Sequence, residues 1–277
     1  MASGQSESLP VMEGPSLLSA VYKHRELVAE LVKRELRDRH VGQLLGAMWA
    51  YGHPLFLMLM YSLLFAYVFP TRVAGSSNGH PNFAVSILSG IVSWLAFQDL
   101  LGRSTTILSA HASIVKQIVF PIVVLPVKTA IAAALPYSVA LLFTIGYAAF
   151  SGSLTIMVLT IPLLIVTQLI AMTGVALMLS ALGIFFRDLR DLVTIFCTVN
   201  LFAQPILYNP FAAPDAMTWV FRLNPFSYQI WCWQDALYFG EFQHPIAWGV
   251  FPLCAISTLG IGYVVFSRLS HSFGDAL

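Results

Sequence analysis

The chain has 277 residues, of which 58% are hydrophobic and only 10% are charged, and its formal net charge is +1. Soluble domains carry about 25% charged residues because their surfaces face water. From Thr129 to Phe186 there is no Asp, Glu, Lys, Arg or His, whereas about 20 apolar residues suffice to cross a bilayer. The composition therefore excludes a soluble fold, predicts an all-α integral membrane protein, and gives no reason to expect a nucleic-acid partner.

The N-terminal part of the chain is polar and charged. Residues 1–16 have neither an apolar core nor a basic start, so they are not typical of a signal peptide and predict a disordered cytoplasmic tail. In residues 17–45, Val28, Leu31 and Val32 recur at helical spacing between Lys, Arg and Glu. This pattern predicts an amphipathic helix at the membrane surface. The helix is either a lipid anchor or a platform that docks a partner.

Residues 46–277 form the predicted transmembrane domain. Apolar runs predict six spans, at roughly 47–69, 83–109, 122–149, 154–183, 192–208 and 246–267. Ser151-Gly152-Ser153 predicts a tight turn that divides the long uncharged run into two of these spans. An even number of spans puts both termini on one side, and twelve of the fourteen Lys and Arg residues lie on that side. These are Lys23, Arg25, Lys33, Arg34, Arg37, Arg39, Arg103, Lys116, Lys128, Arg187, Arg190 and Arg268. The positive-inside rule then places both termini in the cytoplasm.

Few ionisable residues interrupt the predicted spans. His53 lies near the start of the first span, where an interfacial role with a local hydrogen bond is favoured over a proton relay. Asp99 and Arg103 stand four residues apart in the second span, so they share a helix face and can form an ion pair. An intramembrane acid is also a candidate functional residue. No second acid within the predicted spans supports a carboxylate relay.

A cluster of four charges, Arg187, Asp188, Arg190 and Asp191, interrupts the segment "GIFFRDLRDLVTIF" at residues 183–196. The cluster falls on a short loop between the fourth and fifth spans, where charge avoids the cost of entering hydrocarbon. Pairing of Arg187 with Asp191, and of Asp188 with either Arg, is expected to start the fifth helix. Two Arg residues alone would suffice for orientation, so the acids favour a structured elbow.

The most unusual segment, residues 202–242, contains twelve aromatic residues and four prolines. "YNPF" and "LNPF" each place a residue before proline, which disfavours helix at that point. Short broken helices of the re-entrant kind are therefore expected at the outer membrane boundary. An aromatic belt is the simpler interpretation, but this density of rings favours a platform on which sugar rings stack.

Motifs for chemistry are missing from the chain. It has no G-x-x-x-x-G-K-[ST] phosphate loop, no metal-binding motif and no nucleophile elbow, so neither a metal site nor catalytic residues are predicted. If this protein does work, the energy therefore comes from elsewhere. Cys197, Cys232 and Cys254 show no disulfide or metal-site spacing and are expected to be small core residues.

Four blocks in order carry a family resemblance: "RELRDRHVGQLLGAMWAYGHP", "SIVKQIVFPIVVLP", "FFRDLRDLV", and "QPILYNP" followed by "RLNPFSYQI". Together they resemble the membrane subunits of ABC transporters that export polysaccharides, such as lipid-linked O-antigen and teichoic-acid chains. Certain capsule exporters of this group lack the Phe-Arg-Asp signature found here at 186–188. The resemblance therefore favours O-antigen-like cargo.

The resemblance implies a homodimeric permease in the bacterial inner membrane, driven by a separate ABC ATPase that carries the ATP and Mg, with no cofactor on this chain. A coupling helix at about 110–121 and the N-terminal helix would contact that ATPase. The expected coupling residues are Arg34, Arg39, His111, Ser113, Val115, Lys116, Arg187 and Asp188. The expected substrate path comprises Trp49, Tyr51, Tyr208, Trp219, Phe226, Tyr228, Trp231, Trp233 and Tyr238.

Other functions stay open at this point. Within ABC transport, the alternatives are a permease for capsule or for small hydrophobic molecules. From another class, the rival is a membrane scaffold or assembly protein without a transport path. A proton-coupled carrier is the weakest alternative, because it needs His53 or Asp99 to titrate.

Overall fold

The computed structural model describes residues 17–39, 42, 46, 48–68, 83–112, 121–208 and 215–276. All regular structure in these ranges is helical. The predicted tail at 1–16 lies outside them. The elements are α1 (Leu17–Lys23), α2 (Arg25–Asp38), α3 (Met48–Leu63), η1 (Leu64–Val68), α5 (Phe83–Ser104), α6 (Ile107–Ala110), α8 (Val124–Ala134), α9 (Tyr137–Phe150), η2 (Ile156–Thr160), α10 (Ile161–Phe185), α11 (Leu189–Phe202), α12 (Asp215–Leu223), α13 (Pro225–Gln234), η3 (Asp235–Phe239), α14 (Pro245–Leu269), η4 (Ser270–Ser272) and α15 (Phe273–Ala276).

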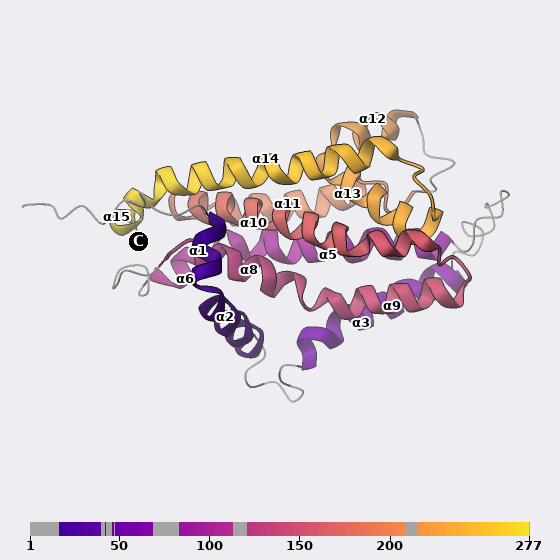
Figure 1. Ribbon diagram of the computed structural model, residues 1–277, viewed down its shortest axis with the longest axis horizontal. Helices are drawn as coiled ribbons and strands as arrows, with labels where there is room; N and C mark the ends of the chain where they lie inside the picture. The colour runs from indigo at the N-terminus through magenta and orange to yellow at the C-terminus, as the bar shows by residue number, and fades with distance from the viewer. Residues whose placement is uncertain are drawn as a thin grey trace, which may run out of the picture.

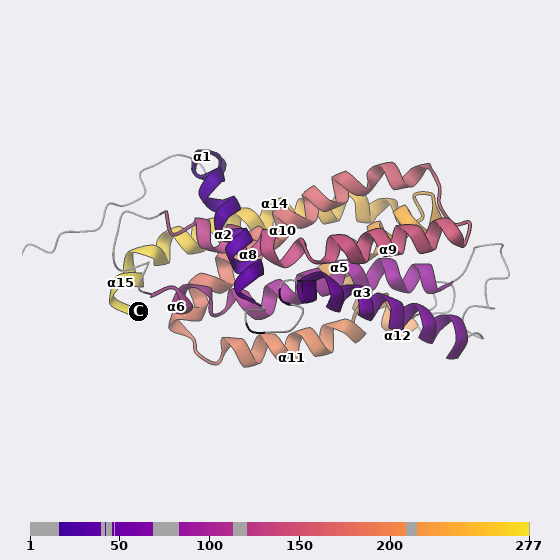
Figure 2. The same ribbon diagram turned by 90° about the horizontal axis from the view of Figure 1, so that it is seen from below.

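The long helices run side by side along the long axis of the molecule (Figure 1). α6 and α15 lie at one end of this bundle, and α12 lies near the other (Figures 1 and 2). We refer to these as the α6 end and the α12 end. α1 and α2 run across the bundle axis rather than along it (Figure 2).

Four helical segments among the described residues are long and apolar enough to cross a membrane: Phe83–Ser104, Val124–Phe150, Ile156–Phe185 and Pro245–Ser272. They correspond to four of the six spans predicted from the sequence. The other two predicted spans fall on α3 with η1 and on α11. α11 has 14 residues, so it is about 21 Å long, against a hydrocarbon core of about 30 Å.

α5 is the central helix of the bundle. It contacts α8, α9, α10, α11 and α13, and its bulky side chains Trp94 and Phe97 are buried. Helices that are apolar on all sides are stable only when other elements surround them or when lipid does. The sequence of α5 therefore suits a position inside the protein.

α10 and α14 pack at close range through two glycines. A Cβ added at Gly174 would lie 2.5 Å from the Thr258 carbonyl carbon and 2.6 Å from the Leu259 Cα. A Cβ at Gly262 would meet the backbone of Gly174, including its carbonyl carbon at 2.9 Å. Small residues allow such backbone approach between membrane helices, so these glycines set the separation of the two longest helices.

The third predicted span is interrupted. α8 ends at Ala134 and α9 begins at Tyr137, with Pro136 at the break. Proline removes a helix hydrogen bond and clashes with the preceding turn, and the sequence analysis did not anticipate this break. The turn expected at Ser151-Gly152 is confirmed, with Gly152 in the left-handed conformation at φ 73°.

The predicted amphipathic segment is two helices, α1 and α2, rather than one. The apolar side of α2 does not face lipid alone, because Val28 and Val32 are buried against Val124 and Ala132 of α8. Neither interpretation of this segment, lipid anchor or docking platform, included packing on the same chain. The packing fixes α2 against α8, the first helix of the third predicted span.

The Pro-containing aromatic segment forms short helices, as expected. α12 ends before Asn224, whose side-chain oxygen accepts a hydrogen bond from the Phe226 N–H at 3.1 Å and caps α13. The Asn224 amide also donates to Asn200 Oδ1 at 2.7 Å and to the Ala203 carbonyl at 2.9 Å, which joins α13 to the end of α11. "LNPF" thus encodes a helix break, a cap and a tertiary contact.

Candidate functional site

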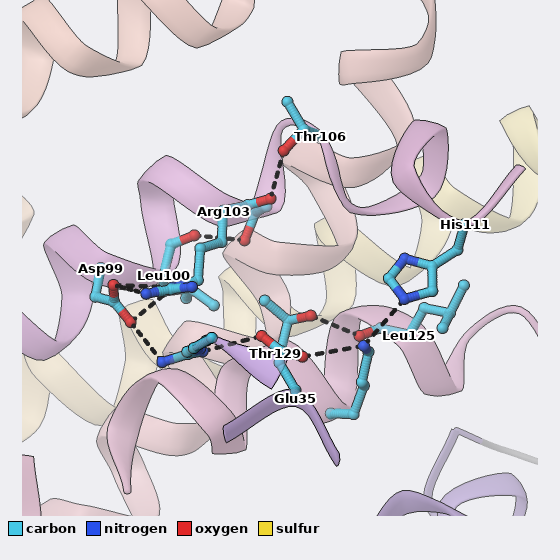
Figure 3. Close-up of polar contacts among 11 residues, drawn as sticks. Glu35, Asp99, Leu100, Arg103, Thr106, His111, Leu125 and Thr129 are labelled. Atoms are coloured by element: carbon cyan, nitrogen blue, oxygen red, sulfur yellow. Dashed lines mark hydrogen bonds and ion pairs between the residues drawn. The ribbon is translucent and has the colours of Figure 1, made fainter. Parts of the chain in front are cut away.

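The chain contains a buried network of charged side chains between α2, α5 and α8, at the α6 end (Figure 3). Glu35 of α2 is its centre. Glu35 Oε1 lies 2.9 Å from Arg39 Nη2, and Glu35 Oε2 lies 3.0 Å from Lys128 Nζ on α8. The Lys128 side chain is only 4% exposed and that of Arg39 only 10%. These contacts add charge pairs to the apolar packing of α2 on α8.

The same network includes the ion pair expected within α5. Arg103 Nη2 lies 2.7 Å from Asp99 Oδ1, and Arg103 Nε lies 2.9 Å from both carboxylate oxygens. Arg39 adds a second guanidinium, with Nη1 3.4 Å from Asp99 Oδ2. Asp99 is therefore paired with two guanidinium groups, one from its own helix and one from the end of α2.

His111 lies beside Lys128 in a defined tautomer. Its Nδ1 is 2.9 Å from the Ile107 carbonyl oxygen, and its Nε2 is 3.4 Å from Lys128 Nζ. A carbonyl only accepts and an ammonium only donates. The Nδ1 therefore carries the proton, and the neutral imidazole accepts from Lys128 through Nε2.

The charge of Glu35 depends on its neighbours. Burial raises the pKa of Glu35, but Lys128 and Arg39 more than offset this, so the pKa lies below its usual value of 4.5. Removing one partner of such a buried pair leaves an uncompensated charge, which typically costs about 3–5 kcal/mol. Loss of one of these charges would therefore also weaken the remaining ion pairs that hold α2 against α8.

A cleft of about 570 Å³ opens beside this network, and we call it the basic cleft. Side chains from α2, α5, α6, α8 and the start of α11 converge on it, although they are up to 159 positions apart in the sequence (Leu31 to Arg190). Its charged and His lining residues are Arg34, Glu35, Asp38, Arg39, Arg103, His111, Lys128 and Arg190.

The basic cleft brings together some of the predicted coupling residues. Arg34, Arg39 and His111 line it, and Arg190, which was not among them, does as well. Arg187 and Asp188 are exposed at the turn before α11 and do not line it. The predicted coupling residues Ser113, Val115 and Lys116, and most of the predicted coupling helix, lie outside the described residues.

The pairing expected within the charged cluster at 187–191 is wrong. All four charged side chains, at positions 187, 188, 190 and 191, are exposed and described. Among the ion pairs of the described residues, none joins two members of the cluster. Asp188 precedes α11 without a side-chain capping bond, while Asp191 lies in the first turn. The acids suit the positive end of the helix dipole without pairing.

A second cleft, of about 550 Å³, lies at the α12 end, and we call it the aromatic cleft. Tyr208, Tyr228 and Trp231 of the predicted substrate path line it, beside Arg222 and His244. The Trp231 and His244 rings stack with centroids 5.2 Å apart and planes within 9°. The aromatic cleft therefore combines flat apolar faces with polar groups.

The buried carboxylate of Asp235 orients His244 in the wall of the aromatic cleft. Asp235, in η3, is 0% exposed and accepts from His244 N at 3.0 Å, His244 Nδ1 at 2.8 Å and Trp248 Nε1 at 3.0 Å. The sequence analysis missed Asp235. The only local signal was an acid within an aromatic segment, and its partners follow nine or more positions later. The carboxylate fixes the orientation of His244, and hence of the ring that stacks on Trp231.

Other members of the predicted substrate path do not lie in the aromatic cleft. Trp49 and Tyr51 are exposed near the start of α3, and Trp219 is exposed on α12. Phe226 packs edge-on against two rings of α5, Trp94 at 5.5 Å and Phe97 at 5.2 Å. It is a core contact rather than a free face.

Trp233 and Tyr238 are core residues. They are 3% and 2% exposed, respectively. Trp233 Nε1 donates to Gln168 Oε1 at 3.0 Å, and Gln168 Nε2 donates to the Ser93 carbonyl at 3.1 Å. Neither Trp233 nor Tyr238 lines the aromatic cleft. Trp233 lies instead beside a separate apolar pocket together with Gln168 and Met172.

The remaining sequence predictions concern thiols, metals and His53. Cys197 and Cys232 are buried and Cys254 is half-buried, all three as free thiols. Within the described ranges, no group of three or more His, Cys, Asp or Glu residues could hold a metal ion. His53 is exposed on α3 beside Pro54.

Comparison with known proteins identifies the family. The profile of the ABC-2 type transporter family matches residues 26–238. This chain belongs to that family. The match covers α2 with its ion network, the start of α11, and α12 and α13. The basic cleft lies within the matched region, and the aromatic cleft lies within it except for residues 243–247. The chain is thus a membrane-embedded transporter subunit, and the resemblance seen in the four sequence blocks is confirmed.

Relatives of this ABC-2 subunit carry a more specific name. An O-antigen export system permease protein RfbA of Klebsiella pneumoniae is 27% identical over 258 residues, which cover 91% of this chain and 95% of that protein. A protein of the same name from Myxococcus xanthus is 28% identical over 267 residues, covering 94% of this chain and 99% of that protein. The similarity therefore extends over nearly the full length of both proteins.

Proposed function

We propose that this chain is the permease subunit of an exporter for a lipid-linked polysaccharide of the O-antigen type. The observation that carries the proposal is the aromatic cleft, built from short helices at one end of a membrane-embedded ABC-2 subunit. The names of its full-length relatives support the same cargo.

The proposed topology has six spans in the bacterial inner membrane, with both termini in the cytoplasm. α3 with η1 and α11 supply the two spans beyond the four apolar segments described above. The α6 end faces the cytoplasm, because the positive-inside rule puts twelve Lys and Arg residues on that side, and eleven of them belong to the described segments. The orientation of α1 and α2 across the bundle axis suits helices that lie in the membrane plane.

The energy for export comes from a separate ATPase subunit that carries ATP and Mg. Two copies of this chain form the transport path, and the ATPase acts on the α6 end through α2 and the segment after α6. Because α2 is joined to α5 and α8 by charge pairs, a displacement of α2 is transmitted to the bundle.

The aromatic cleft provides a surface for the glycan as it leaves. Aromatic faces attract the C–H faces of sugar rings with little dependence on sugar register. Arg222 and His244 add hydrogen-bonding groups beside those faces. A chain of repeating sugars can therefore slide along these faces, because no single position of the chain is bound much more tightly than the next.

The test is deletion of the gene in its own host, followed by complementation with wild type or with Trp231→Ala. Loss of surface polysaccharide on deletion, with the lipid-linked glycan accumulating inside, is the expected result. Trp231→Ala should restore protein abundance in the membrane but only part of the export. Unchanged surface polysaccharide would overturn the proposal, and drug sensitivity in its place would support a small-molecule exporter.

A further inference from the structure

The walls of the basic cleft carry a surplus of positive charge. The lining cations are Arg34, Arg39, Arg103, Lys128 and Arg190. The lining acids are Glu35 and Asp38, and Asp99 joins them through its bonds to Arg39 and Arg103. Five cations and three acids leave a net charge of +2, because His111 is neutral. A half-enclosed cavity weakens screening by water, so the surplus acts on whatever occupies it.

The acids are already committed to partners within the network. Glu35 is held by Arg39 and Lys128, and Asp99 is held by Arg39 and Arg103. They leave Arg190 with no acid within ion-pair distance among the described residues. The buried Nε of Arg39 also lacks an acceptor. The cleft therefore has donor capacity that the described part of the chain does not use.

One further cation is available at the mouth of the cleft. Arg34 Nε lies 3.3 Å from Asp38 Oδ2, but the two side chains are 78% and 58% exposed. Exposed pairs of this kind contribute about 0–1 kcal/mol, so Arg34 can exchange Asp38 for a stronger acceptor. Arg34 and Arg190 thus approach the cleft from different helices, α2 and α11, and both are free to bind an anion.

The chemistry of the donors indicates a phosphate. Guanidinium groups match the oxygens of phosphate in two parallel hydrogen bonds, and a cleft of about 570 Å³ has room for one or two phosphate groups. The cleft lies between α2, which runs across the bundle axis, and helices of a membrane-embedded subunit. Phosphate groups on lipid headgroups are the anions that a basic cleft in such a place meets.

We propose that the basic cleft binds the phosphate headgroup of a membrane lipid, with Arg190 and Arg34 as the direct ligands and Arg39 and Lys128 supplying buried positive charge. The binding does not require polysaccharide export, so it can be tested without the ATPase and without a glycan. A failure of the export proposal would leave this one standing, and the reverse also holds.

The experiment uses the purified, delipidated full-length chain and native mass spectrometry. The probes are phosphatidylglycerol, zwitterionic phosphatidylcholine and inorganic pyrophosphate. We expect phosphatidylglycerol to bind clearly tighter than phosphatidylcholine. Arg190→Gln should weaken its binding about tenfold, since hydrogen bonds to charged groups contribute about 1.5–3 kcal/mol, and Arg190→Lys should weaken it less.

Arg268→Gln is the matched control. Arg268 is exposed in the last turn of α14, which leads into α15 at the α6 end, and does not line the basic cleft. Its loss removes the same charge, so equal effects at positions 190 and 268 would mean non-specific attraction and would overturn the site. Tight binding of pyrophosphate without any of phosphatidylglycerol would overturn the lipid assignment. A thermal melt of each variant separates weaker binding from misfolding, and Arg34→Gln offers a second test if Arg190→Gln does not fold.

Discussion

Gly262 on α14 offers a direct measurement of how closely the two longest helices pack. In Gly262→Ala the new Cβ would meet the Gly174 backbone, with the carbonyl carbon at 2.9 Å and the carbonyl oxygen closer still. Backbone cannot rotate away as a side chain can, so α10 and α14 must separate. Overpacking of this kind typically costs about 1–3 kcal/mol.

Gly260→Ala supplies the reference, because a Cβ at Gly260 meets nothing within 4 Å. Both substitutions are in α14 and both gain about 1 kcal/mol of helix propensity. The difference between the two variants therefore isolates the contact, and we expect Gly262→Ala to be less stable by about 1–3 kcal/mol.

The assay is thermal unfolding of the purified protein in one detergent. A change of 1 kcal/mol shifts Tm by about 2–4 °C for soluble proteins of 150–250 residues, so the two variants should differ by several degrees. Equal Tm values for Gly260→Ala and Gly262→Ala would refute the close approach of α10 and α14.

Further substitutions test the ion network and the two tryptophans of α13. Lys128→Met should lower stability by about 3–5 kcal/mol by leaving Glu35 with less compensation, and adding Glu35→Gln should recover part of this loss in thermal melts. Because the pKa of Glu35 is depressed in the folded protein, its contribution is present above pH 4.5 and is lost as the pH falls below it. Wild-type Tm should therefore drop in acid more steeply than that of Glu35→Gln. Trp233→Phe removes a donor to buried Gln168 and should cost about 1–3 kcal/mol, whereas Trp231→Ala should reduce glycan export at nearly unchanged Tm. Equal loss of Tm in the two Trp variants would argue against a cleft role for Trp231.

Local sequence features predicted the helix breaks where the responsible residues are adjacent. Gly152 ends α9 with a turn, and Asn224 caps α13 ahead of Pro225. The break at Pro136 was missed because an apolar run continues on both sides of it. Hydropathy also did not show that the helix in the fifth predicted span, α11, has only 14 residues.

The site was harder to predict than the helices. Asp99 and Arg103 lie one helical turn apart, so their spacing was enough to expect the pair. Arg39 is 60 positions from Asp99 and Lys128 is 93 positions from Glu35, and no local pattern links them. For the same reason the charges at 187–191 were expected to pair with one another, whereas Arg190 points to a cleft built from four other segments.

The sequence by itself determined that this protein is helical and membrane-embedded and that it belongs to the ABC-2 type transporter family. Apolar runs of this length cannot form the water-facing surface that a soluble protein needs. The four motif blocks also occur in the same order as in the family. Only the tertiary structure decided which charges are compensated and which aromatic rings are accessible. Trp231 and Trp233 are two positions apart and equal in composition, yet one lines a cleft and the other is buried against Gln168. The difference is set by the helices packed around them, which local spacing does not encode.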